Sequence, residues 1–153
     1  MSIEKVKEYF KQFNRENDIL ELEHSSATVE LAAQALGVEP ARIAKTLSFK
    51  TDNGAILVVT AGDKRIDNKK FKQTFAIKAR MLSSEEVFIY TGHKIGGVCP
   101  FGLPDKNIKV YLDESLKRFD TVFPACGSGN SAIELTPYEL EKFSNSTAWV
   151  DVT

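Results

Sequence analysis

The chain has 153 residues and a formal net charge of −1, with 42% hydrophobic and 27% charged residues. These values are typical of one globular domain that is large enough to bury a core of its own. They argue against a membrane protein, since no apolar run approaches the roughly 20 residues that a bilayer-spanning helix needs. Because the net charge is close to zero, any binding of nucleic acid must come from a local basic patch.

Cysteine and histidine are sparse in this sequence. Cys99 and Cys126 are too few for a disulfide framework, so reduced thiols are expected, with a single bridge between them as the alternative. His24 and His93 lie far apart, and no cysteine or histidine spacing resembles a metal site. We therefore expect neither a metal nor a cofactor. The N-terminus lacks the apolar segment of a signal peptide, which indicates a cytoplasmic protein.

Helical periodicity begins near the N-terminus, where Ile3, Val6, Phe10 and Phe13 share one helical face and Ser2 is a plausible N-cap. Start and stop signals predict further helices at 28–37, 40–45, 68–75, 83–92 and from 136 onward. The signals include capping residues, namely Thr28, Gly37, Pro40, the capping-box pair Ser83 and Glu86, and the start formed by Thr136, Pro137 and Glu139.

Strand-like runs at 46–50 and 55–62 are separated by the turn sequence 51–54, which predicts a hairpin whose second strand is central. Further strands are expected at 18–23, 108–113, 121–126, 131–136 and 147–152. Several connections are too short for parallel crossovers. We therefore expect a single α/β (α+β) domain over residues 1–153, with a mixed, mainly antiparallel, partly barrel-like sheet surrounded by helices.

The stretch 94–104, KIGGVCPFGLP, combines three glycines with two prolines. Glycine lets backbone N–H groups turn toward a ligand, which could be a phosphate, a carboxylate or the oxyanion of an acyl transfer. The stretch matches neither a P-loop nor a dinucleotide-binding fingerprint. By itself, such a loop is more often a structural turn than a binding site.

Two side chains in or near this pattern allow more than one interpretation. Cys99 could be a nucleophile with His93 as its base, but no third orienting group is identifiable, so a small packed thiol is favoured. Lys45 stands where a helical turn is expected to meet a strand. If it faces inward it needs a functional reason, whereas an exposed lysine at a helix C-terminus is favourable with the helix dipole. The residues alone leave these two interpretations of Lys45 equal.

The segment Lys64–Arg80 contains seven cations and the single acid Asp67. Its cations are Lys64, Arg65, Lys69, Lys70, Lys72, Lys78 and Arg80. Such asymmetry is typical of a surface that contacts a phosphate backbone. A solvated lysine-rich helix is the alternative, and the charge run alone favours it.

Two segments of the chain, ARIAKTLSF and GGVCPFG, together resemble the YbaK/ProX (YbaK/EbsC) family of prolyl-tRNA editing domains. The matching positions are Lys45, Thr46 and Leu47, followed far later by Gly96, Gly97, Val98, Cys99 and Pro100. VELAAQALGV and SAIELTP also resemble the family, so the resemblance covers about residues 20 to 143.

The resemblance implies an aminoacyl-tRNA deacylase that acts in trans on the ester of a mischarged tRNA, with tRNA(Pro) expected. Its implied catalytic residues are Lys45, Gly96 and Gly97. The implied substrate-binding residues are Thr46, Val98, Cys99, Pro100, Gly127, Ser128, Gly129 and Asn130. The family uses groups of the substrate, such as the vicinal ribose hydroxyl, in place of a protein base. In this interpretation Lys64–Arg80 is a tRNA-docking surface and an aminoacyl-tRNA synthetase is a further partner.

The chain departs from the family pattern where amino-acid specificity is determined. Cys99 stands where the branch that removes cysteine often has serine, Ala132 also differs from that branch, and the histidine of the alanine-removing branch is missing from this region. The amino acid that is removed therefore stays open. Two other functions remain as alternatives: a non-catalytic nucleotide- or RNA-binding module of the same fold, and a thiol-dependent hydrolase using Cys99.

Overall fold

The most apolar run of the sequence becomes the centre of the fold. In the computed structural model, which describes residues 2–153, this run forms β3 (Gly54–Ala61), and β3 is buried along nearly all of its length. β2 (Ile43–Thr51) pairs with it in antiparallel register, from Ala44 opposite Ala61 to Thr51 opposite Gly54. The predicted hairpin is therefore confirmed.

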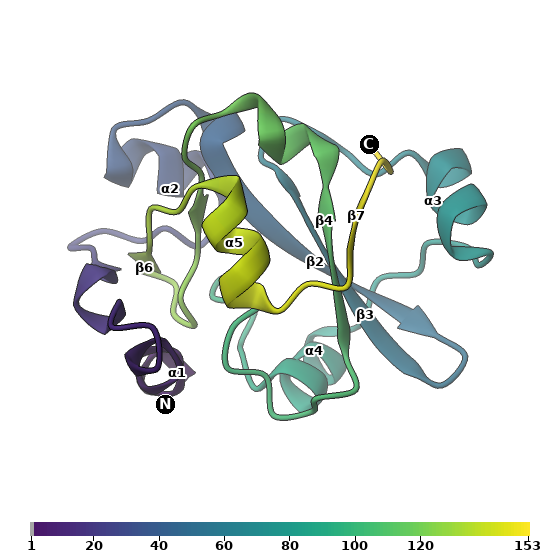
Figure 1. Ribbon diagram of the computed structural model, residues 1–153, viewed down its shortest axis with the longest axis horizontal. Helices are drawn as coiled ribbons and strands as arrows, with labels where there is room; N and C mark the ends of the chain where they lie inside the picture. Colours follow the sequence, from purple (N-terminus) through teal and green to yellow (C-terminus); the bar gives the residue numbers. More distant parts are fainter. Residues whose placement is uncertain (1) are drawn as a thin grey trace.

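A curled five-stranded sheet is built around this hairpin in the order β5-β2-β3-β4-β7 (Figure 1). The other strands of the two sheets are β1 (Leu20–Glu21), β4 (Lys109–Asp113), β5 (Phe123–Pro124), β6 (Ser131–Ala132) and β7 (Ala148–Val150). β1 and β6 form a separate antiparallel pair. The predicted mixed sheet surrounded by helices is confirmed.

The prediction that the sheet is mainly antiparallel is wrong for the five-stranded sheet. Only β2–β3 is antiparallel there, whereas β2–β5, β3–β4 and β4–β7 are parallel. The physical reason lies in the connections, since the segment from β3 to β4 contains two helices and the segment from β4 to β7 contains another. Connections of this length allow parallel crossovers.

Five α-helices and three 3₁₀ turns of the described residues flank the sheet. The helices are α1 (Ser2–Lys11), α2 (Val29–Leu36), α3 (Asn68–Phe75), α4 (Ser84–Thr91) and α5 (Pro137–Ser144), and the turns are Glu16–Asp18, Pro40–Arg42 and Glu114–Arg118. The predicted caps are confirmed: Thr28 caps α2, Gly37 ends it in the left-handed conformation, and capping boxes start α4 and α5. Each helix of residues 2–153 falls short of the length and apolar character needed to cross a bilayer.

Several predicted boundaries are wrong. The helix expected at 40–45 is a single 3₁₀ turn that ends at Arg42, so Lys45 lies inside β2. Ser2 is already helical, and its hydroxyl bonds to His93 instead of capping α1. The strands expected at 18–23, 121–126, 131–136 and 147–152 shrink to two or three residues each, and beyond them Val122 and Leu135 form an isolated antiparallel bridge.

The two faces of the sheet pack against different helices. On one face Leu57 and Val59 belong to the largest core cluster, together with Phe10 of α1 and Leu140 of α5. On the other face Phe71 of α3 packs with residues of β2 and β3. Figure 1 places α3 at the opposite end of the molecule from α1, α2 and β6. The cavities described below lie toward the α2 and β6 end.

The carboxylate of Asp113 joins the C-terminal segment to the end of β4. Its two oxygens accept hydrogen bonds from the backbone N–H of Ser115 (3.0 Å), the backbone N–H of Val152 (2.9 Å) and the hydroxyl of Thr153 (2.8 Å). Asp113 is fully buried. We expect Asp113→Ala to lower the free energy of unfolding by about 2–3 kcal/mol, because it leaves buried donors without an acceptor.

Urea unfolding measures this loss, and Asp120→Ala, at an exposed position, is the matched control. Equal stability of the two variants would contradict the role assigned to Asp113.

Candidate functional site

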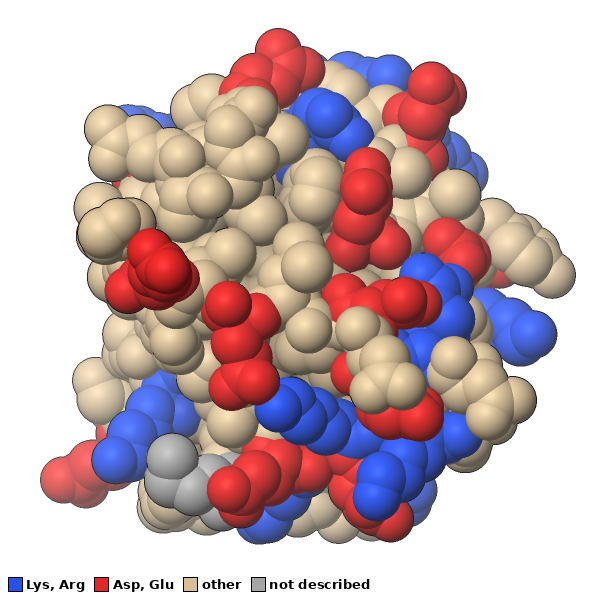
Figure 2. Space-filling model, turned by 90° about the vertical axis from the view of Figure 1, so that its left-hand side faces the viewer, with Lys and Arg blue, Asp and Glu red and all other residues tan. Residues whose placement is uncertain are grey.

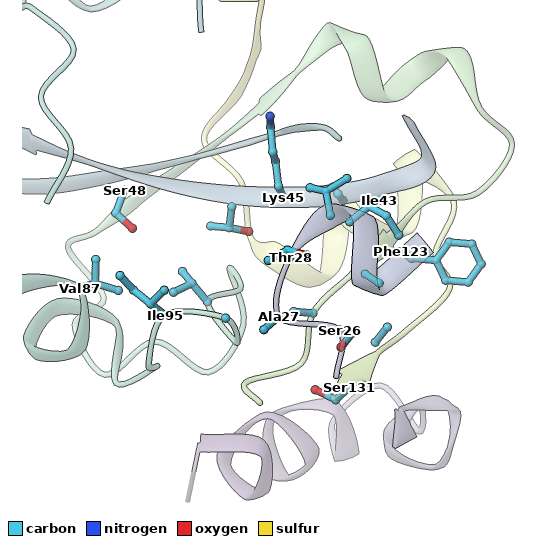
Figure 3. Close-up of a pocket in the computed structure, with 18 of the residues that line it drawn as sticks. Ser26, Ala27, Thr28, Ile43, Lys45, Ser48, Val87, Ile95, Phe123 and Ser131 are labelled. Atoms are coloured by element: carbon cyan, nitrogen blue, oxygen red, sulfur yellow. The ribbon is translucent and has the colours of Figure 1, made fainter. Parts of the chain in front are cut away.

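A cavity of about 240 Å³ lies between β2, the start of α2 and the glycine loop at 94–98 (Figure 3). Its wall is formed largely by small apolar side chains, including Ala27, Ala32, Ala44, Ala125 and Ala132. Pockets for drug-sized ligands usually measure about 300–1,000 Å³. This cavity therefore suits a small chemical group and is too small to enclose a nucleotide.

Five lining residues carry hydroxyl groups, namely Ser26, Thr28, Thr46, Ser48 and Ser131. Two of these hydroxyls have structural roles. The Thr28 oxygen accepts from the N–H of Leu31 at 3.2 Å to cap α2, and the Ser131 oxygen accepts from the Ser128 hydroxyl at 2.8 Å.

The hydroxyls of Ser26 and Thr46 are in a different situation. Both oxygens are buried and have no hydrogen-bond partner anywhere in residues 2–153, and Ser26 is only 8% exposed. Burying a hydroxyl without a partner costs about 1–3 kcal/mol. Neither oxygen has accessible surface in the cavity, so both lie behind its wall and lower the stability of the fold without offering a contact to a ligand.

Lys45 borders the same cavity, but its side chain points away from it. Successive residues of a strand face opposite sides of the sheet, and Figure 3 shows the Lys45 amine on the other side of β2 from Ser26, Ser48 and Ser131. The ammonium donates a hydrogen bond to the carbonyl of Lys64. Burial lowers the pKa of Lys45, and the charge of Arg65 lowers it further. Lys45 is thus a half-buried strand residue, and the alternative of an exposed lysine at a helix C-terminus is wrong.

The glycine loop separates this cavity from a second one. Gly96 and Val98 line the first cavity, Gly97 lines the second, and Ile95 lines both. The second cavity measures about 450 Å³ and is also lined by Ser2, Ile3, Lys5, Phe88, Gly92, Lys94, Gly127, Ser128 and Gly129. The structure thus brings together two loops that are far apart in the sequence, as the resemblance implied.

Gly97 has a packing role in addition to any chemical one. A Cβ at this position would lie 2.6 Å from the backbone nitrogen of Ser128, which leaves no room for a side chain. Its own N–H already donates to the carbonyl of Lys94 at 3.0 Å. Gly97 therefore allows the two loops to touch, and its N–H is not free to bind an oxyanion.

Three of the predicted substrate-binding residues lie outside both cavities. Cys99 is fully buried in the main core cluster. Pro100 lines a small separate depression beside Tyr9. Asn130 holds its own turn in place, because its side-chain amide donates to the carbonyl of Leu22 at 3.1 Å. Cys99, Pro100 and Asn130 thus do not line either cavity and instead belong to the structure that holds the two loops.

Cys99 and His93 do meet, as the nucleophile hypothesis requires, with 3.5 Å between Sγ and Nε2. Both side chains are fully buried, however, and burial raises the pKa of Cys99 to about 12. His93 Nε2 lies 2.9 Å from the carbonyl of Phe101, to which it can only donate, so Nδ1 accepts from the hydroxyl of Ser2. At neutral pH this arrangement provides neither a thiolate nor access to it, and the thiol-dependent hydrolase is not supported.

The basic segment Lys64–Arg80 reaches the site only at its two ends. The carbonyl of Lys64 accepts from Lys45, and Arg80 directly precedes Met81 of the cavity wall. Among the described residues, Lys70 is the one cation of this segment with a salt bridge, which it forms with Asp151. Figure 2 shows the opposite end of the molecule, where acidic and basic side chains are interspersed over the surface.

Sequence reasoning missed three features of the site. Ser26 and Ala27 lie on the segment before α2, which carries no motif of its own. Ser2 closes one side of the second cavity through its bond to His93, although the two residues are far apart in the chain. An N-cap pattern at Thr28 was the only signal that this segment has a defined backbone.

The sequence is similar to a known domain family and to several known proteins. The sequence profile of the aminoacyl-tRNA editing domain matches residues 23–143. The chain is 63% identical to the uncharacterized protein YwhH of Bacillus subtilis, over 99% of this chain and 97% of that protein. It is 31% identical to EbsC of Enterococcus faecalis, named as a candidate Cys-tRNA(Pro)/Cys-tRNA(Cys) deacylase, over 80% of this chain and 74% of EbsC.

Two further similarities concern proteins whose names refer to proline. The chain is 33% identical to the proline–tRNA ligase of Caldicellulosiruptor bescii, over 77% of this chain but 21% of the ligase. The crystal structure of a candidate trans-editing enzyme for prolyl-tRNA synthetase superposes with a TM-score of 0.89 and 31% identity, over 99% of this chain and 96% of that one. The ligase similarity thus concerns one part of a larger protein, and the structural similarity concerns a whole chain.

The burial of both cysteines can be tested chemically. Burial raises the pKa of Cys126 as well as that of Cys99, so a disulfide-exchange thiol reagent at pH 8 should modify neither cysteine in the folded protein. Both should react after unfolding in urea. Rapid modification of Cys99 in the folded state would revive the nucleophile hypothesis.

The buried imidazole of His93 predicts a dependence of stability on pH. Burial lowers the pKa of His93 below its ordinary value, so the unfolded chain binds the proton more readily than the folded one. The stabilisation is therefore complete above about pH 6.5 and is lost as the pH falls through that value toward the folded-state pKa, with a slope of up to about 1.4 kcal/mol per pH unit. His93→Gln should flatten this slope between pH 7.5 and 5.5.

Urea unfolding at several pH values gives the slope, and His24→Gln, at an exposed position, is the control. An unchanged slope in His93→Gln would show that other groups carry the pH dependence.

Proposed function

This chain belongs to the aminoacyl-tRNA editing domain family, and from this premise we propose that it hydrolyses the ester of a mischarged tRNA, with tRNA(Pro) as the carrier. Water adds to the acyl carbon, the bond from that carbon to the ribose oxygen breaks, and a free amino acid and a tRNA with a free hydroxyl leave. The observation that carries the proposal is that Thr46 of β2 and Gly96 of the glycine loop line one small cavity, with Lys45 at its edge.

The two cavities divide the substrate between them. The smaller one takes the aminoacyl group, because its volume and alanine-rich wall suit a small side chain. The larger one takes the terminal nucleotide, where Phe88 is 51% exposed and can stack on a base, and Lys5 and Lys94 can neutralise phosphate. The ester then lies at the Gly96–Gly97 backbone, which separates the cavities.

The lining residues of both cavities include no carboxylate, imidazole or thiol within the described part of the chain. A protein group acting as general base is therefore missing from the wall, in agreement with activation of water by the substrate's own vicinal ribose hydroxyl. Lys45 contributes a cation at the edge of the site. Because its side chain points away from the cavity hydroxyls, we assign it to a phosphate of the tRNA end and not to the oxyanion of the acyl group.

The similarity to proline–tRNA ligases supports tRNA(Pro) as the carrier and a synthetase as a partner that supplies it. In this proposal the ends of the segment Lys64–Arg80 contact the tRNA acceptor stem, because their cations can neutralise its phosphates. A tRNA substrate also places the protein in the cytoplasm.

Deacylation of a panel of mischarged tRNA(Pro) species tests the proposal. We expect wild type to release at least one small amino acid, and Lys45→Ala to lower kcat/KM by about 10-fold or more, mainly through KM, because a charge-assisted contact to phosphate contributes about 1.5–3 kcal/mol. On a minimal aminoacyl-adenosine ester without a phosphate, the same variant should lose little.

Lys50→Ala is the control, since Lys50 pairs with Glu86 away from the cavity walls. Equal losses on the tRNA and on the minimal ester would assign Lys45 to the acyl group instead of a phosphate. Salt-sensitive binding of tRNA with no release of any amino acid would favour a non-catalytic RNA-binding module.

A further inference from the structure

Most of the large apolar side chains that the fold leaves exposed lie in one short segment beside the two cavities. Of the seven such side chains in residues 2–153, four fall within residues 81–95. These four are Met81, Phe88, Ile89 and Ile95, and each is between 51% and 71% exposed. Single exposed apolar side chains are ordinary on a protein surface, whereas a group of them marks an interaction site.

The four side chains form one surface, which we call the apolar rim. Met81 and Ile95 line the smaller cavity, and Ile95 and Phe88 line the larger one. Figure 3 shows Ile95 beside Val87 of α4. Ile89 lies on the outer side of α4, because Val87, two positions before it, is buried in a core cluster. The apolar rim therefore runs from the mouths of both cavities onto the outer side of α4.

The charges beside the apolar rim favour a nucleic acid as its occupant. Lys94 directly precedes Ile95, and Arg80 directly precedes Met81, so cations stand at two places along the rim. Both cations are exposed, and neither forms a salt bridge with another described residue. An apolar surface with free cations next to it is the combination that binds single-stranded nucleic acids.

Unpaired RNA nucleotides fit both parts of this combination. Their bases have uncharged faces that stack on apolar and aromatic side chains, while their phosphates bind cations. The acid Glu85 lies one turn before Ile89 on α4, so it would repel a phosphate there and favours a base against this side of the helix. The 3′ end of a tRNA supplies such nucleotides, since unpaired nucleotides precede the terminal one and continue outward from it.

We propose that the apolar rim binds the unpaired nucleotides that precede the terminal nucleotide of the tRNA, with Ile89 against the face of a base. This inference rests on the proposed function, which places the terminal nucleotide in the larger cavity beside Phe88. Contacts with base faces do not read the hydrogen-bonding edges, so this binding tolerates different bases. The single-stranded end of an aminoacyl-RNA is then enough for recognition, without the body of the tRNA.

The experiment measures the hydrolysis of three esters of the same amino acid, the one that wild type releases fastest from tRNA(Pro). The esters are aminoacyl-adenosine, the single-stranded trinucleotide aminoacyl-CCA, and the same end on a short acceptor-stem hairpin. We expect kcat/KM of wild type to be about 10-fold higher on the trinucleotide than on the adenosine ester, because each stacked base adds binding energy. Ile89→Ser should lose about 5-fold on the trinucleotide and the hairpin, mainly through KM, and little on the adenosine ester.

Two further variants control for the substitution itself. Ile89→Leu should keep the wild-type rates, because it keeps the apolar contact. Tyr138→Ser is the matched control, since Tyr138 is as exposed as Ile89 (71%) but lies on α5, outside both cavities. All three variants replace exposed side chains, so they should fold as wild type does. Equal rates of Ile89→Ser and wild type on the trinucleotide would overturn the inference, and so would an equal loss on all three esters.

A second copy of the chain is the competing occupant of the apolar rim. Sedimentation would then show a wild-type dimer that Ile89→Ser converts to a monomer, and this result would overturn the inference.

Failure of the proposed function is a separate result, in which wild type hydrolyses none of the esters. Binding of the CCA trinucleotide without an amino acid, followed by fluorescence anisotropy, then decides the inference. Binding that Ile89→Ser weakens by about 5-fold, and that Tyr138→Ser leaves unchanged, would support it. Absent binding, or equal binding by wild type and Ile89→Ser, would overturn it.

Discussion

The close contact between Gly97 and the backbone of Gly127 and Ser128 is the constraint on which the site depends. A side chain at Gly97 would collide with the Ser128 nitrogen, so only glycine lets the two loops approach this closely. The second loop is held in turn by other backbone bonds, including the N–H of Ser26 to the carbonyl of Gly129 at 2.7 Å. Through these contacts one glycine positions the walls of both cavities.

The groups behind these loops support the site without taking part in its chemistry. Cys99 and His93 form a buried cluster under the glycine loop, and the bond from Ser2 to His93 brings the start of α1 against it. Because burial keeps the thiol protonated and the imidazole neutral, the cluster acts as packing. In the proposed reaction the reacting groups are therefore those of the substrate and water, and the protein holds them in position.

Local signals account for what could be predicted from the sequence. The hairpin of β2 and β3, the capping boxes of α4 and α5, and the left-handed Gly37 depend on residues close together in the chain, and all are observed. The parallel strand pairs depend on long crossovers and could not be deduced from local patterns. Lys45 was placed at a helix end because Pro40 favours a helical start, whereas the turn stops after three residues.

The site residues also fall into two groups, those that the sequence identified and those that only the folded structure defines. The two loops were identified through the resemblance, but which of their residues face the cavity was not. Val98 lines the cavity whereas Cys99 next to it lies in the core, because neighbouring residues of the loop face opposite ways. The unpartnered hydroxyls of Ser26 and Thr46 could not be found from the sequence at all, since a missing partner is a property of the folded surroundings.

The central claim is that the aminoacyl end of a tRNA lies between β2 and the two glycine loops. Backbone amide NMR shifts of the folded chain, recorded on adding a non-hydrolysable amide analogue of aminoacyl-adenosine, test it most directly. The account predicts that the largest shift changes fall on the residues of the two cavities, around Ser26, Thr46, Gly96 and Ser128. Changes confined to the basic helix α3, or spread without reference to the cavities, would contradict it.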